Sequence, residues 1–179
     1  MISPVIIQGV GVIALIANLS VFQTNKRQKM ILFGLCGCLL WATHFFLLGA
    51  LTGMAVNLVA AFRFYVYYRT KPTKSNIWIM WSFLGITALA TALTWQGWIS
   101  LLPFIGTASG VIAFWQNKTK YIRRLAMASP PPWLLYAIIV GSYPGIVVES
   151  LLLVSNLVGQ ARFDFNKLQY RKLLRIGPR

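Results

Sequence analysis

Acidic residues are nearly absent from this chain, whose 179 residues include two Asp or Glu against seventeen Lys or Arg. Histidine occurs once, as His44, and the only cysteines are Cys36 and Cys38, two positions apart in an apolar run. Such a sequence offers no pair of buried acids, no metal-ligand cluster and no nucleophile beside a base. We therefore expect neither an enzyme nor a cofactor or metal site. The cysteine spacing predicts two different helix faces and no disulfide.

Long polar stretches are also scarce. The chain is 58% hydrophobic, with a mean hydropathy of +0.67. Seven apolar runs cover residues 4–22, 30–48, 52–68, 77–95, 99–115, 125–140 and 143–158. A membrane-spanning helix needs about 20 residues, so these runs predict seven transmembrane helices. The first run has no basic segment before it and no evident cleavage site, so we expect it to be retained.

The basic residues lie in short clusters between the apolar runs, which favours membrane loops over a nucleic-acid surface. Sixteen of the seventeen fall in the connections after the first, third and fifth runs and in the tail: Lys26, Arg27, Lys29, Arg69, Lys71, Lys74, Lys118, Lys120, Arg123, Arg124, Arg162, Lys167, Arg171, Lys172, Arg175 and Arg179. With seven spans these segments share one side, which the positive-inside rule makes cytoplasmic. The N-terminus is then periplasmic and the C-terminus cytoplasmic. The seventeenth, Arg63, is expected to snorkel toward the basic side.

The chain also matches itself at a shift of 92 residues without a gap. The identical pairs are Ile13/Ile105, Phe22/Phe114, Asn25/Asn117, Lys26/Lys118, Trp41/Trp133, Gly49/Gly141, Gly53/Gly145 and Val56/Val148. This predicts two parallel three-helix repeats, 1–68 and 99–161, joined by a linker helix within 69–98: an all-α 3+1+3 membrane fold like that of SWEET carriers. A basic cytoplasmic tail, 162–179, is expected to lie against anionic lipid.

Prolines predict irregularities in two of the later runs. In 99–115, Pro103 with Gly106 and Gly110 predicts a kink or local unwinding. In 125–140, three successive prolines at 130–132 predict a break in the helix.

Glu149 is the one acid expected within the bilayer, where an ionisable group is expensive and is functional by default. The shift of 92 pairs it with Asn57, and it pairs His44 with Tyr136. We expect Glu149 to face the interface between the repeats and to hydrogen-bond among these polar neighbours. The candidate substrate-binding residues are Glu149, Asn57, His44, Tyr136, Asn156, Gln8, Trp41 and Trp133. For His44 and Gln8, a hydrogen-bonded packing role is the more common alternative.

Four segments resemble the bacterial inner-membrane YgjV family: residues 8–14, 44–49, 102–107, and the pattern Glu149, Leu152, Leu153, Asn156 and Arg162. The stretch His-Phe-Phe-Leu-Leu-Gly at 44–49 is the most specific of them. The family is grouped with the MtN3-like, PQ-loop and SWEET-like proteins, so the resemblance implies the 3+1+3 architecture and an inner-membrane location. It implies no particular substrate. The chain has no Pro-Gln pair, so the sugar-carrier mechanism is not carried over.

Two functions remain open at this point. The first is a small-molecule carrier with a polar site between the repeats. The alternative is a non-transporting scaffold, sensor or accessory subunit, in which Glu149 pairs with Arg63 or bonds Asn57 to hold the bundle together. The expected partners are the lipid bilayer and, for a carrier, a small polar solute; self-association is left open, and no nucleic acid is expected.

Overall fold

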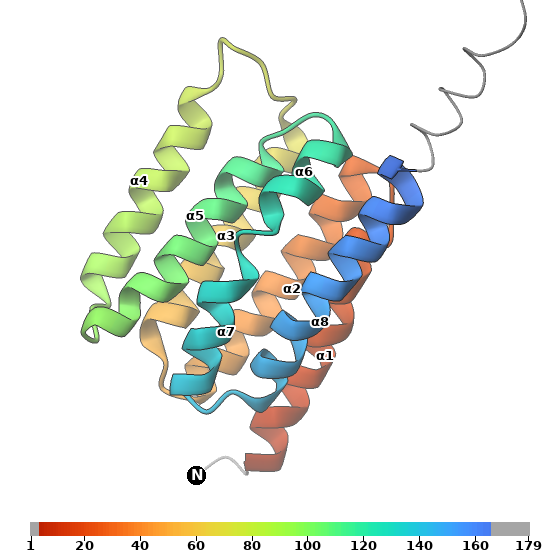
Figure 1. The fold of residues 1–179 in the computed structure, drawn as a ribbon. Coiled ribbons are helices and arrows are strands. Elements are labelled where there is room, and N and C mark those ends of the chain that lie inside the picture. The colour runs from red at the N-terminus through yellow and green to blue at the C-terminus, as the bar shows by residue number, and fades with distance from the viewer. Residues whose placement is uncertain (1–3, 166–179) are drawn as a thin grey trace, which may run out of the picture.

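The computed structural model describes residues 4–165, and every regular element in this range is helical. In chain order the elements are α1 (Pro4–Phe22), α2 (Arg27–Leu47), α3 (Leu51–Arg69), α4 (Trp78–Leu93), the 3-10 turn η1 (Trp98–Ser100), α5 (Leu101–Phe114), α6 (Thr119–Ala126), α7 (Pro130–Ile139), α8 (Tyr143–Gln160) and the π-helical turn η2 (Ala161–Phe165). The long helices stand side by side and run alternately up and down (Figure 1). The expected all-α membrane protein is confirmed, whereas the predicted tail falls outside the described residues from 166 onward.

Three helical segments are long and apolar enough to cross a membrane: Val5–Phe22, Arg27–Leu47 and Tyr143–Asp164. Trp78–Leu93 and Trp98–Phe114 are shorter apolar helices. Helix α3 has a suitable length of 19 residues, but it contains Arg63 and a polar aromatic end rich in tyrosine, which lower its hydropathy. The count of seven spans therefore stays a prediction.

The predicted break in the sixth apolar run is confirmed. Helix α6 ends at Ala126 and α7 begins at Pro130, and the two lie one above the other in Figure 1. The three prolines occupy the first turn of α7, where a missing N–H removes no helical hydrogen bond. In the link between the helices, Ser129 Oγ donates to the Gly106 carbonyl of α5 at 2.9 Å.

The local unwinding predicted for the fifth run is wrong, because α5 is one uninterrupted α-helix. Pro103 is its third residue, again a position that needs no backbone donor. Gly106 serves close packing instead: a Cβ at this position would collide with the indole ring of Trp133.

Two turns in the molecule have the same backbone geometry, one between α2 and α3 and the other between α7 and α8. Gly49 and Gly141 lie at their centres with φ of 71° and 70°, a left-handed conformation that glycine adopts without strain. The following residues also match, since Ala50 N–H donates to the Phe45 carbonyl and Ser142 N–H to the Ala137 carbonyl, both at 2.9 Å. Every position in this comparison differs by 92 residues.

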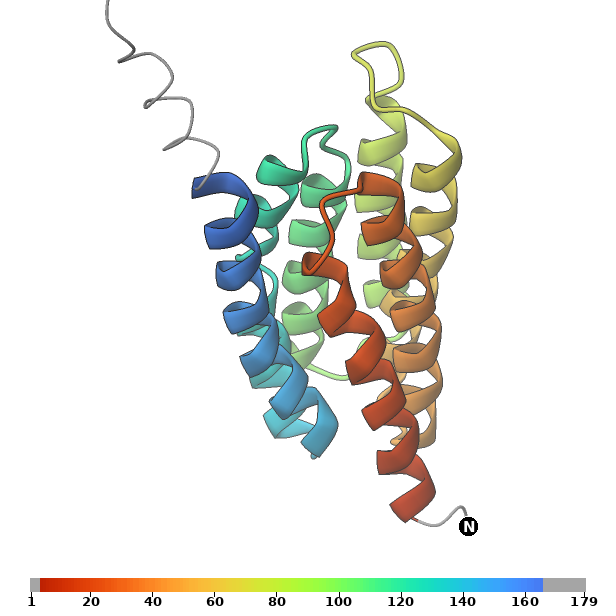
Figure 2. The ribbon, with the colours of Figure 1, turned by 90° about the vertical axis from the view of Figure 1, so that its right-hand side faces the viewer.

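Packing of the helices follows a matching pattern. Helix α2 packs on both α1 and α3, and α7 packs on both α5 and α8. Between these two groups, α1 packs on α8 and α3 packs on α5. The α1–α8 side is seen in Figure 2, where the first and last helices lie together. Helix α4 stands at the edge of the bundle against α3 and α5.

Candidate functional site

A cavity of about 120 Å³ lies inside the bundle and is called the central cavity here. Its lining comes from α1, α2, α3, α5, α6, α7 and α8, with no residue from α4. Most of the lining is apolar or glycine. The lining residues with polar side-chain atoms are Asn18, Cys38, Trp41, Asn57, Arg63, Thr107, Ser129, Trp133 and Glu149. The volume leaves room for several water molecules or a small solute.

Arg63 is the cation of the central cavity, and it is only 3% exposed. Its expected snorkelling is therefore wrong. The guanidinium is held within the bundle by the ring of Phe64, 4.4 Å from Cζ to the ring centroid, and by one hydrogen bond from Nη1 to the Gly110 carbonyl at 2.7 Å. Nε is buried without a hydrogen-bond partner. A guanidinium has five N–H donors, so within the described residues most of its binding capacity is unused.

Glu149 also lines the central cavity, which agrees with the expectation that it faces the interior of the bundle. The hydrogen bonds expected for it are wrong. Asn57 donates to the Gly53 carbonyl at 2.9 Å, and Tyr136 Oη accepts from the Gly53 N–H at 3.1 Å. No donor among residues 4–165 reaches the Glu149 carboxylate. The ion pair found among these residues joins Arg123 and Asp164 instead. The cavity thus contains one cation and one carboxylate that are not bonded to each other.

Two tryptophans and Asn57 complete the polar lining that the sequence pointed to. Trp41 and Trp133 both line the central cavity. Phe45 lies between them, 5.7 Å from each ring centroid. Trp41 Nε1 is buried without a hydrogen-bond partner. Unpartnered buried N–H groups are uncommon in proteins and call for an explanation.

His44 and Tyr136 do not line the central cavity. Each of them connects the middle helix of one group of helices, α2 or α7, to the third helix of the other group, α8 or α3. His44, on α2, contacts the Ile7 carbonyl at 2.9 Å and the hydroxyl of Ser142 at 2.8 Å, at the start of α8. Tyr136, on α7, reaches the start of α3 through Gly53. Hydrogen-bonded packing therefore accounts for both side chains.

Gln8 and Asn156 also lie away from the central cavity. Gln8 Oε1 is buried without a hydrogen-bond partner. Asn156, two turns beyond Glu149, was expected to share its surroundings. It donates instead to the Arg123 carbonyl at 2.8 Å and accepts from Gln160 at 3.4 Å. Seven residues of an α-helix turn through about 700°, which is close to two full turns. Asn156 is therefore slightly rotated from Glu149 about the helix axis, and this rotation directs it toward α6.

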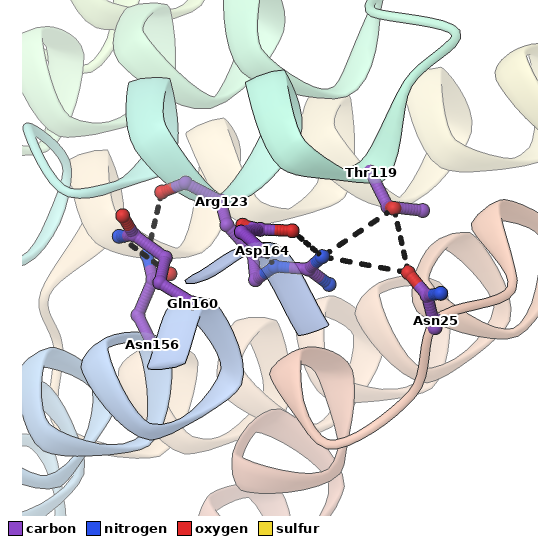
Figure 3. Close-up of polar contacts among 6 residues, drawn as sticks. All are labelled: Asn25, Thr119, Arg123, Asn156, Gln160 and Asp164. Atoms are coloured by element: carbon purple, nitrogen blue, oxygen red, sulfur yellow. Dashed lines mark hydrogen bonds and ion pairs between the residues drawn. The ribbon is translucent and has the colours of Figure 1, made fainter. Parts of the chain in front are cut away.

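Asn156 belongs to a second polar cluster, which surrounds Arg123 at the end of the bundle where α6 begins (Figure 3). Arg123 is fully buried and binds both carboxylate oxygens of Asp164, with Nε–Oδ2 at 3.0 Å and Nη2–Oδ1 at 2.5 Å. Asn25 Oδ1 accepts from Arg123 Nη2 at 3.4 Å and from Thr119 at 2.8 Å. The cluster thereby joins the α1–α2 connection, α6 and η2. This bidentate pair was not predicted, because Asp164 lies 41 residues after Arg123 in a segment assigned to the tail.

Comparison with known proteins now places the chain. A family model described as "Bacterial inner membrane protein" (Imp-YgjV) matches residues 5–167. The chain belongs to the YgjV family. A relative from Escherichia coli (strain K12), "Inner membrane protein YgjV", is 28% identical over 161 residues, which cover 87% of this chain and 83% of the relative. No solved structure matches the chain. The YgjV resemblance seen in the sequence is therefore confirmed, and the protein is a bacterial inner membrane protein.

Proposed function

We propose that this protein is a carrier for a small polar solute, which binds in the central cavity. The observation that carries the proposal is the unpaired state of the two charges there. Both Arg63 and Glu149 line a space of about 120 Å³, and the side chains around them supply no counter-charge. Burying such groups is costly unless they gain partners. A solute that supplies those partners is a physical reason to keep both charges inside an apolar bundle.

The matched turns support a carrier built from two three-helix units. The first is α1–α3 and the second is α5–α8, in which α6 and α7 together count as one broken helix. Gly49 and Gly141 have the same conformation, and the helices after them begin with the same hydrogen bonds. The two units contact each other through α1 with α8 and through α3 with α5, as a two-fold arrangement would require. In carriers made of parallel repeats, rocking of one unit against the other exposes a site at their interface to each side in turn.

The proposal includes seven spans with α4 as the linker, and the basic connections on the cytoplasmic side. Charge supports this orientation, since the basic residues gather in and beside the connections after α1, α3 and α5, including helix α6. An alkaline phosphatase fusion in the turn at Gly49 should be active, and one after Arg179 should be inactive. An active fusion at the C-terminus would refute the seven-span topology.

The scaffold alternative depended on Glu149 fastening the bundle through Arg63 or Asn57. Neither contact forms among the described residues. This weakens the structural role that Glu149 would have in a scaffold and favours the carrier.

Uptake into proteoliposomes tests the carrier directly. Vesicles containing the purified protein, loaded with buffer and supplied with radiolabelled amino acids, organic acids, amines and sugars, should accumulate at least one class above protein-free vesicles. Glu149→Gln should reduce that uptake at least about tenfold and leave the melting temperature nearly unchanged, because no bond is lost. The matched control is Ser150→Ala. Ser150 is the exposed neighbour of Glu149 and bonds only to its own helix, at the Ile146 carbonyl. If no solute accumulates, or if the two variants behave alike, the carrier proposal fails.

A further inference from the structure

The two charged residues that line the central cavity lie at different heights along the helix bundle. Helices α3 and α8 run in the same direction (Figure 1) and begin directly after the matched turns. Glu149 lies eight residues after Gly141, and Arg63 lies fourteen after Gly49. At 1.5 Å of rise per residue, the two Cα atoms differ in depth by about 9 Å. A solute between them would therefore meet a negative group at one end and a positive group at the other.

The negative end is a layer of four lining residues whose sequence positions match around the two turns. Trp41 and Trp133 precede their turn glycines by eight residues, while Asn57 and Glu149 follow theirs by eight. All four line the central cavity. A carboxylate beside aromatic side chains suits an ammonium ion, through charge and cation–π attraction. No described residue supplies a cation to this layer.

The positive end is formed around Arg63. Its guanidinium donates one hydrogen bond to the protein, to the Gly110 carbonyl, and its Nε donates none. The neighbouring rings are those of Phe64, Tyr67 and Phe114, at 4.4, 5.5 and 5.8 Å from Cζ to the ring centroid. A planar fork of N–H donors next to apolar walls matches a carboxylate. The side chain is 3% exposed, so a bound carboxylate would be largely shielded from water.

We propose that the central cavity binds a small zwitterion, with its ammonium group on Glu149 and its carboxylate on Arg63. This inference rests on the proposed carrier only in taking the cavity as the place where the solute binds. It names a substrate class, the amino carboxylates, that the family assignment does not supply. Neutral sugars would leave both charges unpaired, and singly charged solutes would leave one.

Binding to the detergent-purified, full-length protein tests the proposal by isothermal titration calorimetry. The probes are 4-aminobutyrate, its singly charged analogues butyrate and butylamine, and the neutral sugar glucose. The zwitterion should bind at least about tenfold more tightly than any of the others. Across glycine, 4-aminobutyrate and 6-aminohexanoate, affinity should rise from the shortest member, because the two charged groups lie at different depths.

Two variants assign the ends of the site. Glu149→Gln should bring 4-aminobutyrate down to the affinity of butyrate, and Arg63→Gln should bring it down to that of butylamine. Arg63→Lys keeps the cation and should restore part of the affinity, which separates lost binding from lost folding. The control is Ser109→Ala on α5, a partly exposed residue that bonds only within its helix, and it should bind as the original protein does.

The proposal is overturned if glucose binds more tightly than 4-aminobutyrate, if no amino carboxylate binds, or if both charge variants bind like the original protein. Uptake of the same probes separates this inference from the carrier function. Binding of 4-aminobutyrate without uptake would retain the site and refute transport. Uptake of glucose without binding of any amino carboxylate would retain transport and refute the zwitterion.

Discussion

The α1–α3 unit and the α5–α8 unit differ most in how each one treats its buried arginine. Arg123 of the second unit binds Asp164 through two hydrogen bonds and is surrounded by further polar groups. Arg63 of the first unit has one carbonyl and several aromatic rings but no acid. Both are nearly inaccessible to water. The comparison separates a charge that is paired with an acid from one that has no acid bonded to it among the described residues, and the second is the one that we propose meets a ligand.

The strongest test of this difference removes the acid beside Arg123. Asp164→Asn leaves a buried guanidinium without its counter-charge, and we expect a loss of about 3–5 kcal/mol in the free energy of unfolding. Thermal melting of the detergent-purified protein measures it. The double variant Arg123→Met with Asp164→Leu removes both charges and should recover most of the loss. If the single variant melts like the original protein, the ion pair does not hold α6 to η2.

A second test compares the turn of one unit with the turn of the other, whose central glycines have nearly the same φ. Alanine at Gly49 or Gly141 would have to adopt a positive φ, which costs about 1–2 kcal/mol. Because φ is 71° and 70°, the two variants should lower the melting temperature by similar amounts. Gly85→Ala is the control, since a Cβ there meets nothing within 4 Å, and helix propensity predicts slight stabilisation. Clearly unequal effects of the two turn variants would contradict the equivalence.

The smallest expected effect on stability comes from Arg63. Arg63→Met gives up one hydrogen bond and its ring contacts but also removes a buried charge that has no acidic partner. The two contributions oppose each other, so the free energy of unfolding should change by no more than about 1 kcal/mol. The same melting assay measures it beside Asp164→Asn. A loss as large as that of Asp164→Asn would mean that Arg63 is structural after all.

The outline of the fold could be read from the sequence because it depends on long-range averages. Apolar length gives the helices, and the 92-residue match gives the two equivalent turns, which require glycine at Gly49 and Gly141. Four candidate residues, Glu149, Asn57, Trp41 and Trp133, do line one cavity. Each of them lies at the same distance in sequence from a turn glycine, so the repeat carried information about depth.

Side-chain partners could not be derived in the same way. Arg63 looked close enough to the basic end to reach water, yet its direction is set by rotation of α3 toward Gly110. Asn156 lies two turns from Glu149 but faces Arg123. Asp164 finds Arg123 only because η2 bends the chain after α8. Each outcome depends on helix rotation by a few tens of degrees, which an apolar sequence with little amphipathic pattern does not specify.

The contact between α1 and α8 has a consequence for how the protein is made. Helix α1 leaves the ribosome before α8 and cannot meet it until the residues between them have been synthesised. At about 5–20 residues per second, the 121 residues from Phe22 to Tyr143 take roughly 6–24 s. During that interval the groove that α8 will fill on α1 faces lipid or the insertion machinery. Helix α1 suits such a delay, since it carries no charged residue.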